Sequence, residues 1–258
     1  MDDSAEIDIA FDFRSDTPPG RDPDAQSPML RRCHRLLWSK PLPSGAVFTL
    51  LETTPGVYLH HKSHLGEFWL ASDAVVPSFR KEARLSRVFE QISKELSTFL
   101  AIGYTIGGMM VFPGNRVEGK MTINGARGFH PRIKDRFDLT LECIRRHYRN
   151  QDSPLRSTLA RYTGYFQLFG DFKGYTQFFL LQDLVTDDYS AVRFFAPFND
   201  FNSSPIPESM AGYLAYRELA IRFIEARNKR IHTWCTNQRL ANNSMPRAAL
   251  SASADAER

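Results

Sequence analysis

The segments AVFTLLE (residues 46–52), GVYLH (56–60) and GEFWLAS (66–72) decide the fold class of this chain. Each segment is short, rich in β-branched and aromatic residues, and bounded by glycine or proline, which is typical of β-strands. Further along, TIGGMMVFP (105–113) and KMTIN (120–124) are predicted to form a hairpin across residues 114–119. Residues 46–123 therefore predict a small antiparallel sheet.

Helical periodicity surrounds these strands. A helix over residues 80–101 is predicted to lie flat on the sheet, because its apolar residues form one stripe: Leu85, Val88, Phe89, Ile92, Leu96 and Phe99. A short helix is expected after Ser27 and Pro28, which suit the N-cap and first helical position. Later helices are expected from about 131, from 154, over 175–185 and from 208 to about 235, with a possible strand at 191–195. The predicted fold class is α+β, a small antiparallel sheet in the N-terminal half packed by helices concentrated in the C-terminal half.

The length of 258 residues suits one domain, and charge divides the chain unevenly. Residues 1–27 hold eight acidic side chains against Arg14 and Arg21, a net charge of −6, so the remainder carries about +10 within a total of +4. We expect a flexible acidic leader at 1–11, a single α+β domain at 12–238 and a disordered tail at 239–258. A basic body is compatible with nucleotides, nucleic acid or other anions as partners.

Several classes of protein lack support in the sequence. No stretch reaches the roughly 18 to 20 apolar residues of a spanning helix, and the acidic first residues do not suit a signal peptide, so we expect a cytoplasmic protein without a membrane partner. The three cysteines are far apart and form no CxxC or Cys/His pairing, which argues against disulfides and zinc. No motif assigns a cofactor or a common hydrolase or kinase mechanism, and the oligomeric state stays open.

A basic cluster provides the strongest candidate site, formed by Arg127, His130, Arg132, Lys134 and Arg136. Gly125 and Gly128 loosen the backbone before it, and Pro131 marks a helix start. A glycine-containing loop that leads into a helix N-terminus offers backbone N–H donors and the positive end of the helix dipole, so these residues are predicted to bind an anion such as phosphate. The alternative is a solvated loop with local ion pairs.

A second candidate lies in the final helix, where Arg227 and His232 stand five positions apart. This spacing resembles the signature of the HEPN ribonuclease superfamily, which implies that Arg227 stabilises the charged transition state and His232 transfers protons. HEPN domains are all-helical, whereas strands are predicted here. The alternative is a buried arginine paired with a carboxylate.

Other polar groups favour structural interpretations. The basic residues 145–149 suit a helix C-terminus, with Glu142 pairing Arg146. His60 and His61 would point to opposite faces of a strand, which prevents them from sharing one metal ion, and His64 follows in the loop. Asp183 interrupts an apolar helix and needs a partner, for which Lys173 is a candidate. The acidic residues of 12–24 could bind a divalent cation, although Asx-turns and helix caps use the same side chains: Asp12, Asp16, Asp22 and Asp24.

Four long segments carry a family resemblance: SPMLRRCHRLLWSKPLPSG (27–45), TINGARGFHPRIKDRFDLTLECIRRHY (122–148), FGDFKGYTQFFLLQDLV (169–185) and EARNKRI (225–231). They resemble an uncharacterised bacterial family, a domain of unknown function, and the likeness covers roughly residues 11–231. It implies a bacterial, cytoplasmic setting and brings no activity, cofactor or catalytic residue.

The leading functional hypothesis is binding of a nucleotide or nucleic-acid phosphate through Arg127, Arg132 and their neighbours. One alternative is a metal-independent ribonuclease or toxin-like protein that uses Arg227 and His232. Another is a non-catalytic protein-interaction module.

Overall fold

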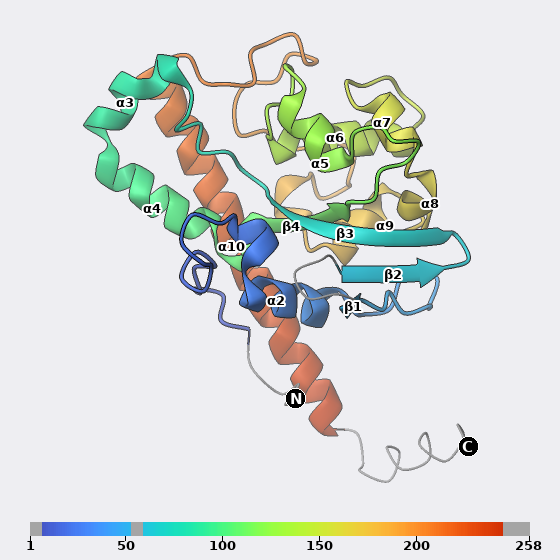
Figure 1. Cartoon of the computed structure of the whole chain (residues 1–258). Coiled ribbons are helices and arrows are strands. Elements are labelled where there is room, and N and C mark those ends of the chain that lie inside the picture. Colours follow the sequence, from blue (N-terminus) through green and yellow to red (C-terminus); the bar gives the residue numbers. More distant parts are fainter. Residues whose placement is uncertain (1–6, 53–58, 245–258) are drawn as a thin grey trace, which may run out of the picture.

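One antiparallel sheet forms the centre of the computed structural model, which describes residues 7–52 and 59–244 (Figure 1). Its strands lie in the order β1 (Leu51–Glu52), β2 (Leu59–Ser63), β3 (Gly66–Ala74) and β4 (Met109–Pro113). Strands β2 and β3 form a tight hairpin in which Ser63 pairs with Gly66, and Ala74 at the end of β3 pairs with Met109. All five residues of β4 are buried, so helices and loops cover both of its faces.

Helices make up most of the remaining described chain, and most of them follow the sheet in sequence. Two precede it, α1 (Pro23–Gln26) and α2 (Pro28–Trp38), and two lie between β3 and β4, α3 (Ser86–Gln91) and α4 (Ser93–Gly103). The C-terminal half contains α5 (Ile123–Phe129), α6 (Phe137–Tyr148), α7 (Arg156–Ala160), α8 (Thr163–Gln167), α9 (Phe172–Phe178) and α10 (Met210–Ser244). Single 3₁₀ turns are η1 (Ala83–Leu85), η2 (Ile106–Gly108) and η3 (Gln182–Leu184). The predicted α+β class, with its small antiparallel sheet, is therefore confirmed.

Helix α2 begins as its sequence predicts. The Ser27 hydroxyl accepts a hydrogen bond from the N–H of Leu30 at 3.0 Å, and Pro28 occupies the first helical position. Its apolar side then buries Leu30, Cys33 and Leu37 in the main core.

Several predicted elements differ, each for a local reason. The helix expected over residues 80–101 is interrupted at Ile92, and its second part, α4, packs against α10 instead of lying on the sheet. Residues 120–124 form no strand, because the Thr122 hydroxyl accepts the N–H of Gly125 at 3.3 Å and caps α5. The helix expected from Pro131 begins at Phe137, since Lys134 and Asp135 adopt left-handed backbone angles with φ of +49° and +62°.

The later elements and the ends of the chain also differ from expectation. Helix α9 stops at Phe178, three residues after the predicted start at 175, and the possible strand at 191–195 forms only an isolated bridge between Val185 and Val192. Ile7, in the predicted flexible leader, is 7% exposed and belongs to the core, while residues 1–6 lie outside the described chain. Residues 239–244 of the predicted disordered tail are the last turns of α10, and residues 245–258 lie outside the described chain.

Helix α10 is anchored to the start of β4 by two buried polar side chains. The Arg227 guanidinium donates to the carbonyl oxygens of Gly107 at 3.0 Å, Met109 at 2.7 Å and Phe179 at 3.1 Å. Next to it, the Asn228 carbonyl accepts the N–H of Gly107 at 2.7 Å, and its amide donates to the Thr105 hydroxyl at 2.8 Å. These bonds satisfy buried backbone groups that would otherwise be costly to desolvate.

Gly107 is required at this contact because nothing larger fits. A Cβ there would lie 2.5 Å from the carbonyl oxygen of Ile224 and 2.7 Å from Oδ1 of Asn228. We predict that Gly107→Ala lowers the free energy of unfolding by about 3 kcal/mol or more, measured by urea denaturation. Gly103→Ala is the matched control, because a Cβ at Gly103 meets nothing within 4 Å, and this variant should be neutral or slightly stabilising. Equal losses in both variants would contradict this account of α10.

Candidate functional site

Arg127 lies inside the protein, on the last turn of α5, and its side chain is fully buried. The guanidinium donates to the carboxylate of Asp73 on β3 and to the carbonyl oxygen of Asp135. It also donates to the carbonyl oxygen of Ala74 at 3.2 Å and to the hydroxyl of Thr140 at 3.2 Å. Arg127 therefore joins β3, α5, the α5–α6 loop and α6, and its donors point into the protein instead of toward solvent.

The rest of the basic cluster is divided between core and surface. Arg136 is 2% exposed and holds the buried Asp138 carboxylate through two hydrogen bonds of 3.1 and 2.5 Å. His130, Arg132 and Lys134 lie in the α5–α6 loop, with Arg132 exposed and the other two half-buried. The helix N-terminus expected at Pro131 is absent, because Gly125 and Gly128 belong to α5 and the next helix starts at Phe137.

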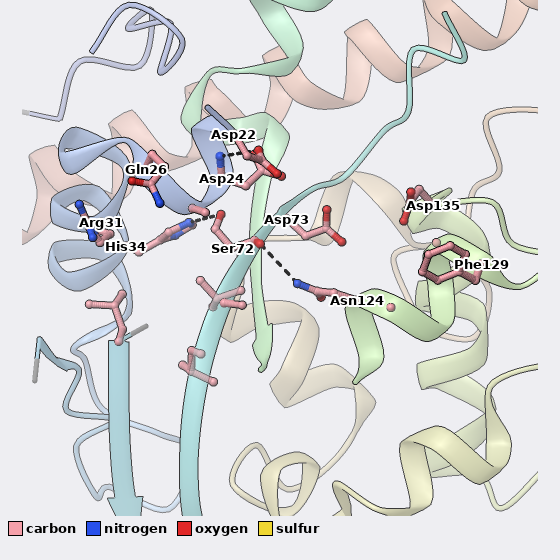
Figure 2. A pocket seen from close by; sticks show the side chains of 17 residues that line it. Asp22, Asp24, Gln26, Arg31, His34, Ser72, Asp73, Asn124, Phe129 and Asp135 are labelled. Atoms are coloured by element: carbon pink, nitrogen blue, oxygen red, sulfur yellow. Dashed lines mark hydrogen bonds between the residues drawn. The ribbon is translucent and has the colours of Figure 1, made fainter. Parts of the chain in front are cut away.

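A cleft beside this loop is lined by buried carboxyl groups and by polar atoms without hydrogen-bond partners in the described chain. One part has a volume of about 580 Å³, and an adjoining part has a volume of about 700 Å³. The two parts share five lining residues, Asp22, Asp24, Asp73, Gly128 and Asp135, so we treat them as one carboxylate cleft. Figure 2 shows Asp22 and Asp24 on the α1 side, Asp73 at the centre, and Asn124 and Asp135 on the α5 side. A volume of this size is typical of small-molecule sites.

Asp24 enters the cleft from α1, a single turn that begins with a side-chain cap. The Asp22 carboxylate accepts the N–H of Asp24 at 3.1 Å, which fixes the turn. One Asp24 oxygen then accepts the N–H of Ala74 at 3.2 Å, whereas Oδ1 is buried and has no hydrogen-bond partner. Burial raises the pKa of Asp24 well above its usual value, and the nearby carboxylates of Asp73 and Asp22 add to the shift. Asp24 therefore keeps its proton to a higher pH than an exposed aspartate does.

Asp73 occupies the centre of the cleft at the end of β3. Burial raises its pKa to about 6, and the negative charge of Asp135 adds to this effect. The ion pair with Arg127 opposes the shift but does not cancel it. Two carboxyl groups with raised pKa values, supplied by α1 and β3, thus face one cleft, an arrangement that is frequent at functional sites.

His34 and Ser72 also line the cleft, and their hydrogen bonds exclude one catalytic role. The Trp38 indole N–H can only donate, so at 3.0 Å it fixes Nδ1 of His34 as an acceptor. Nε2 of His34 then carries the proton and donates to the Ser72 hydroxyl at 2.9 Å, which leaves that hydroxyl to donate to the carbonyl oxygen of Met110 at 3.3 Å. Burial also lowers the pKa of His34 to about 3. The imidazole does not accept a proton from Ser72, so this pair is not an activated nucleophile.

The two ends of the carboxylate cleft differ in character. Near α5, the Asn124 amide donates to the carbonyl oxygen of Ser72 at 3.3 Å while its own Oδ1 is buried without a partner, and the ring of Phe129 is 78% exposed at the mouth. The opposite end is lined by five cationic residues: Arg14, Arg21, Arg80, Lys81 and Lys134. Within the described chain, only Arg14 of these pairs with a carboxylate, through three hydrogen bonds to Asp12. The first part of the cleft therefore combines an exposed ring and an amide with Arg31, and the second part is lined by more cations.

The structure does not bring Arg227 and His232 to one accessible site. The Arg227 guanidinium is fully buried against carbonyl oxygens and lies over the Trp38 ring, with 5.8 Å from Cζ to the ring centroid. His232 is exposed on another side of α10. Arg227 is buried as the alternative expected, but its acceptors are backbone carbonyl oxygens, where a carboxylate was expected.

His60 pairs with Trp69 and His61 with Phe68, four and five positions along β3 from Asp73, which corresponds to about 13–17 Å at roughly 3.3 Å per strand residue, and His64 follows in the turn. His60 stacks on Trp69 at 4.3 Å and has Nε2 2.7 Å from the Glu67 carboxylate. On the other face, the buried His61 contacts the Thr49 carbonyl oxygen at 3.0 Å. The two rings point to opposite faces as predicted, and the group does not meet the Arg127 region.

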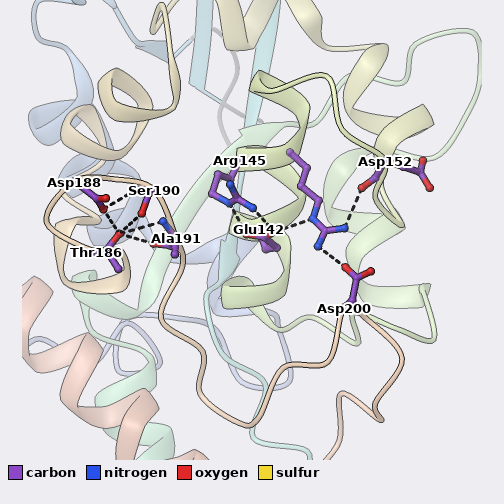
Figure 3. Close-up of polar contacts among 9 residues, drawn as sticks. Glu142, Arg145, Asp152, Thr186, Asp188, Ser190, Ala191 and Asp200 are labelled. Carbon is purple, nitrogen blue, oxygen red and sulfur yellow. Dashed lines mark hydrogen bonds and ion pairs between the residues drawn. The ribbon is translucent and has the colours of Figure 1, made fainter.

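Of the other predicted ion pairs, that of Glu142 with Arg146 is present and that of Asp183 with Lys173 is not. Glu142 pairs with Arg145 and Arg146 at 2.7 Å each, and Figure 3 shows Glu142 beside Arg145. Arg146 also pairs with Asp200 and donates to the carbonyl oxygen of Asp152 at 3.2 Å. Figure 3 also shows a separate polar loop in which the Thr186 hydroxyl donates to Asp188 at 2.6 Å. The partner of Asp183 is Arg230, through two bonds of 2.8 Å, and not Lys173.

The acidic residues 12–24 serve caps and turns. Asp16 accepts the N–H of Met29 at 2.9 Å, Asp12 accepts that of Arg14 at 3.0 Å, and Asp22 caps α1. Across residues 7–52 and 59–244, no group of three His, Cys, Asp or Glu side chains has the geometry of a metal site. In the same residues, no helix combines the length and apolar character needed to cross a bilayer.

Comparison with known proteins identifies the family. The model of a family of unknown function, DUF6994, matches residues 7–231. The chain belongs to the DUF6994 family. No curated protein and no solved structure matches it significantly.

The matched region of this DUF6994 chain contains the whole carboxylate cleft, whose central residue was missed by sequence reasoning. Asp73 was not singled out, and Asp24 was considered only as a cap or metal ligand. One signal was available, because a carboxylate that directly ends an apolar strand run is unlike the hydrophobic residues before it. Its pairing with Arg127, 54 positions away, has no local signature.

The raised pKa of Asp24 predicts a stability effect with a defined sign. A pKa above the unfolded value means that the folded protein binds the proton more tightly, so stability falls as pH rises from about 4 toward neutrality. Asp24→Asn removes the ionisation and keeps an oxygen for the N–H of Ala74. We predict that it raises the Tm at pH 7.5 by about 2–4 °C, as roughly 1 kcal/mol would, and that the gain disappears at pH 4. Asp187→Asn, at a fully exposed carboxylate, is the control. A lower Tm for Asp24→Asn at pH 7.5 would contradict the assignment.

Proposed function

We propose that the carboxylate cleft binds a nucleotide, with the sugar over the Asp24 and Asp73 carboxyl groups and the phosphate at the cationic end. The observation that carries this proposal is the order of chemistry along one cleft: exposed ring and amide, then carboxyl groups, then cations. A nucleotide presents the matching order of aromatic base, hydroxyl-bearing sugar and phosphate.

The cationic end supports the phosphate assignment. Arg21, Arg80, Lys81 and Lys134 line it, and in the described chain none of their side chains pairs with a carboxylate. Unpaired cations beside a cleft are available to an anionic ligand, and charge-assisted hydrogen bonds are the strong ones. Lys134 is the member of the predicted anion-binding set that lines the cleft. Arg127 contributes indirectly, because it holds Asp73 in place.

The centre and the other end support the sugar and base. Carboxylate oxygens recognise vicinal hydroxyls by accepting hydrogen bonds from them, and a protonated Asp24 can also donate a hydrogen bond to a ring or hydroxyl oxygen. The buried Asn124 oxygen without a partner is an acceptor for an exocyclic amine of a base. Phe129, 78% exposed at the mouth, offers a face for stacking.

The chemistry of Asp24 and Asp73 suits general acid–base work on such a ligand. A carboxylic acid whose pKa burial raises well above its usual value, beside one with a pKa of about 6, provides a proton donor and a proton acceptor in the same cleft. Binding is the primary claim, and it is tested separately from any reaction.

Calorimetric titration with AMP, adenosine and ribose 5-phosphate tests the arrangement. We predict saturable AMP binding at low salt, at least tenfold weaker binding of adenosine and of ribose 5-phosphate, and lower AMP affinity as salt rises. Arg80→Gln combined with Lys134→Gln should weaken AMP binding about tenfold and leave adenosine binding unchanged. Asp73→Asn should weaken both.

Lys62→Gln is the matched control, since Lys62 is an exposed lysine on β2 outside the cleft. Its affinity for AMP should equal that of the unchanged protein. Absence of saturable binding by AMP, or binding that Asp73→Asn and the double variant leave intact, would contradict the proposal.

A further inference from the structure

A second pocket surrounds the side chain of Lys40 and, among the described residues, shares no lining residue with the carboxylate cleft. It has a volume of about 610 Å³ and lies between the residues after α2, the second half of α9 and the C-terminal part of α10. Its lining is mainly apolar, with Leu36, Leu42, Phe178 and Trp234 among its members. In the part of the chain that the structure describes, no acidic side chain lines it.

The Lys40 ammonium group is enclosed by three aromatic rings. Its Nζ lies 4.9 Å from the ring centroid of Trp38, 4.7 Å from that of Phe178 and 4.7 Å from that of Trp234. These rings come from α2, α9 and α10, and those of Trp38 and Phe178 are buried. Both backbone groups of Lys40 are hydrogen-bonded. Its N–H donates to the Trp38 carbonyl oxygen at 2.8 Å, and its carbonyl oxygen accepts the N–H of Phe48 at 2.9 Å. The amine is therefore fixed in place.

No carboxylate of the described chain offsets the charge at this position. The charged and titratable groups near Lys40 are Arg227, Arg239 and Cys235, all on α10. Burial lowers the pKa of Lys40 to about 7, and the positive charge of Arg227 adds to the shift. Ring faces favour the charged form, but here they also exclude the water that would solvate it.

We propose that Lys40 is a nucleophilic amine that captures an aldehyde or ketone with an apolar or aromatic body in this pocket, forming an imine. The neutral Nζ adds its electron pair to the carbonyl carbon, giving a carbinolamine. The carbonyl oxygen then leaves as water with the two hydrogens of the amine, and a C=N double bond remains. The step needs only the carbonyl compound, and the apolar lining selects its body.

Reductive trapping with benzaldehyde tests the proposal. The full chain is incubated at pH 7 with benzaldehyde and cyanoborohydride, and the rate of modification of each lysine is followed by peptide mass spectrometry. We expect Lys40 to react at least tenfold faster than exposed Lys62, because a pKa near 7 leaves about half of the amine neutral, against fewer than about 1 in 1,000 for an ordinary lysine. The advantage should vanish in 6 M guanidinium.

Two comparisons separate a built pocket from a merely reactive amine. Benzaldehyde should outcompete glycolaldehyde at Lys40 but not at Lys62, and Trp234→Leu, which opens the cage, should slow labelling of Lys40 severalfold without altering Lys62. Lys40→Arg should abolish the fast-labelled peptide and keep the fold. Labelling of Lys40 no faster than that of Lys62, or a fast rate with no preference between the two aldehydes, would overturn the proposal.

Discussion

The buried guanidinium of Arg127 is the interaction on which the arrangement of the carboxylate cleft depends. It reaches β3 through Asp73 and Ala74, the α5–α6 loop through Asp135, and α6 through Thr140. A buried arginine left without these partners would be costly, because the desolvation of a full charge must be offset by hydrogen bonds and a counter-charge. The same contacts hold Asp73 in the cleft, so the stability of the fold and the geometry of the site rest on one side chain.

The surrounding fold buries the carboxyl groups of the cleft without completing their hydrogen bonds or fully offsetting their charge. Asp24 has one satisfied oxygen and one buried oxygen without a partner, and Asp73 has only part of its charge offset by Arg127. Such local frustration is common where a ligand completes the hydrogen bonding. Burial of Asp24 and Asp73 raises both pKa values, and the free cations at one end provide charge of the opposite sign. We regard the combination as the physical basis of the proposed nucleotide site.

Local sequence patterns predicted much of the fold, and long-range contacts account for what they missed. Strand composition and the Ser27–Pro28 start of α2 were readable because their causes lie within a few residues. The apolar stripe of 80–101 identified helix but not its partner, since the stripe faces α10 instead of the sheet. The basic cluster at 127–136 was read as exposed, yet the acceptors that bury Arg127 come partly from β3, which spacing alone cannot show. Two residues of its loop, Lys134 and Asp135, line the cleft.

A carboxyl ¹³C NMR titration of the aspartate side chains, with and without AMP, tests the central claim most directly. The account predicts that Asp73 titrates near pH 6 and that Asp24 titrates well above the usual range for an aspartate. Addition of AMP should shift the resonances of Asp24 and Asp73 and leave that of Asp187 in place. Midpoints near 4 for both cleft residues, with no response to AMP, would contradict it.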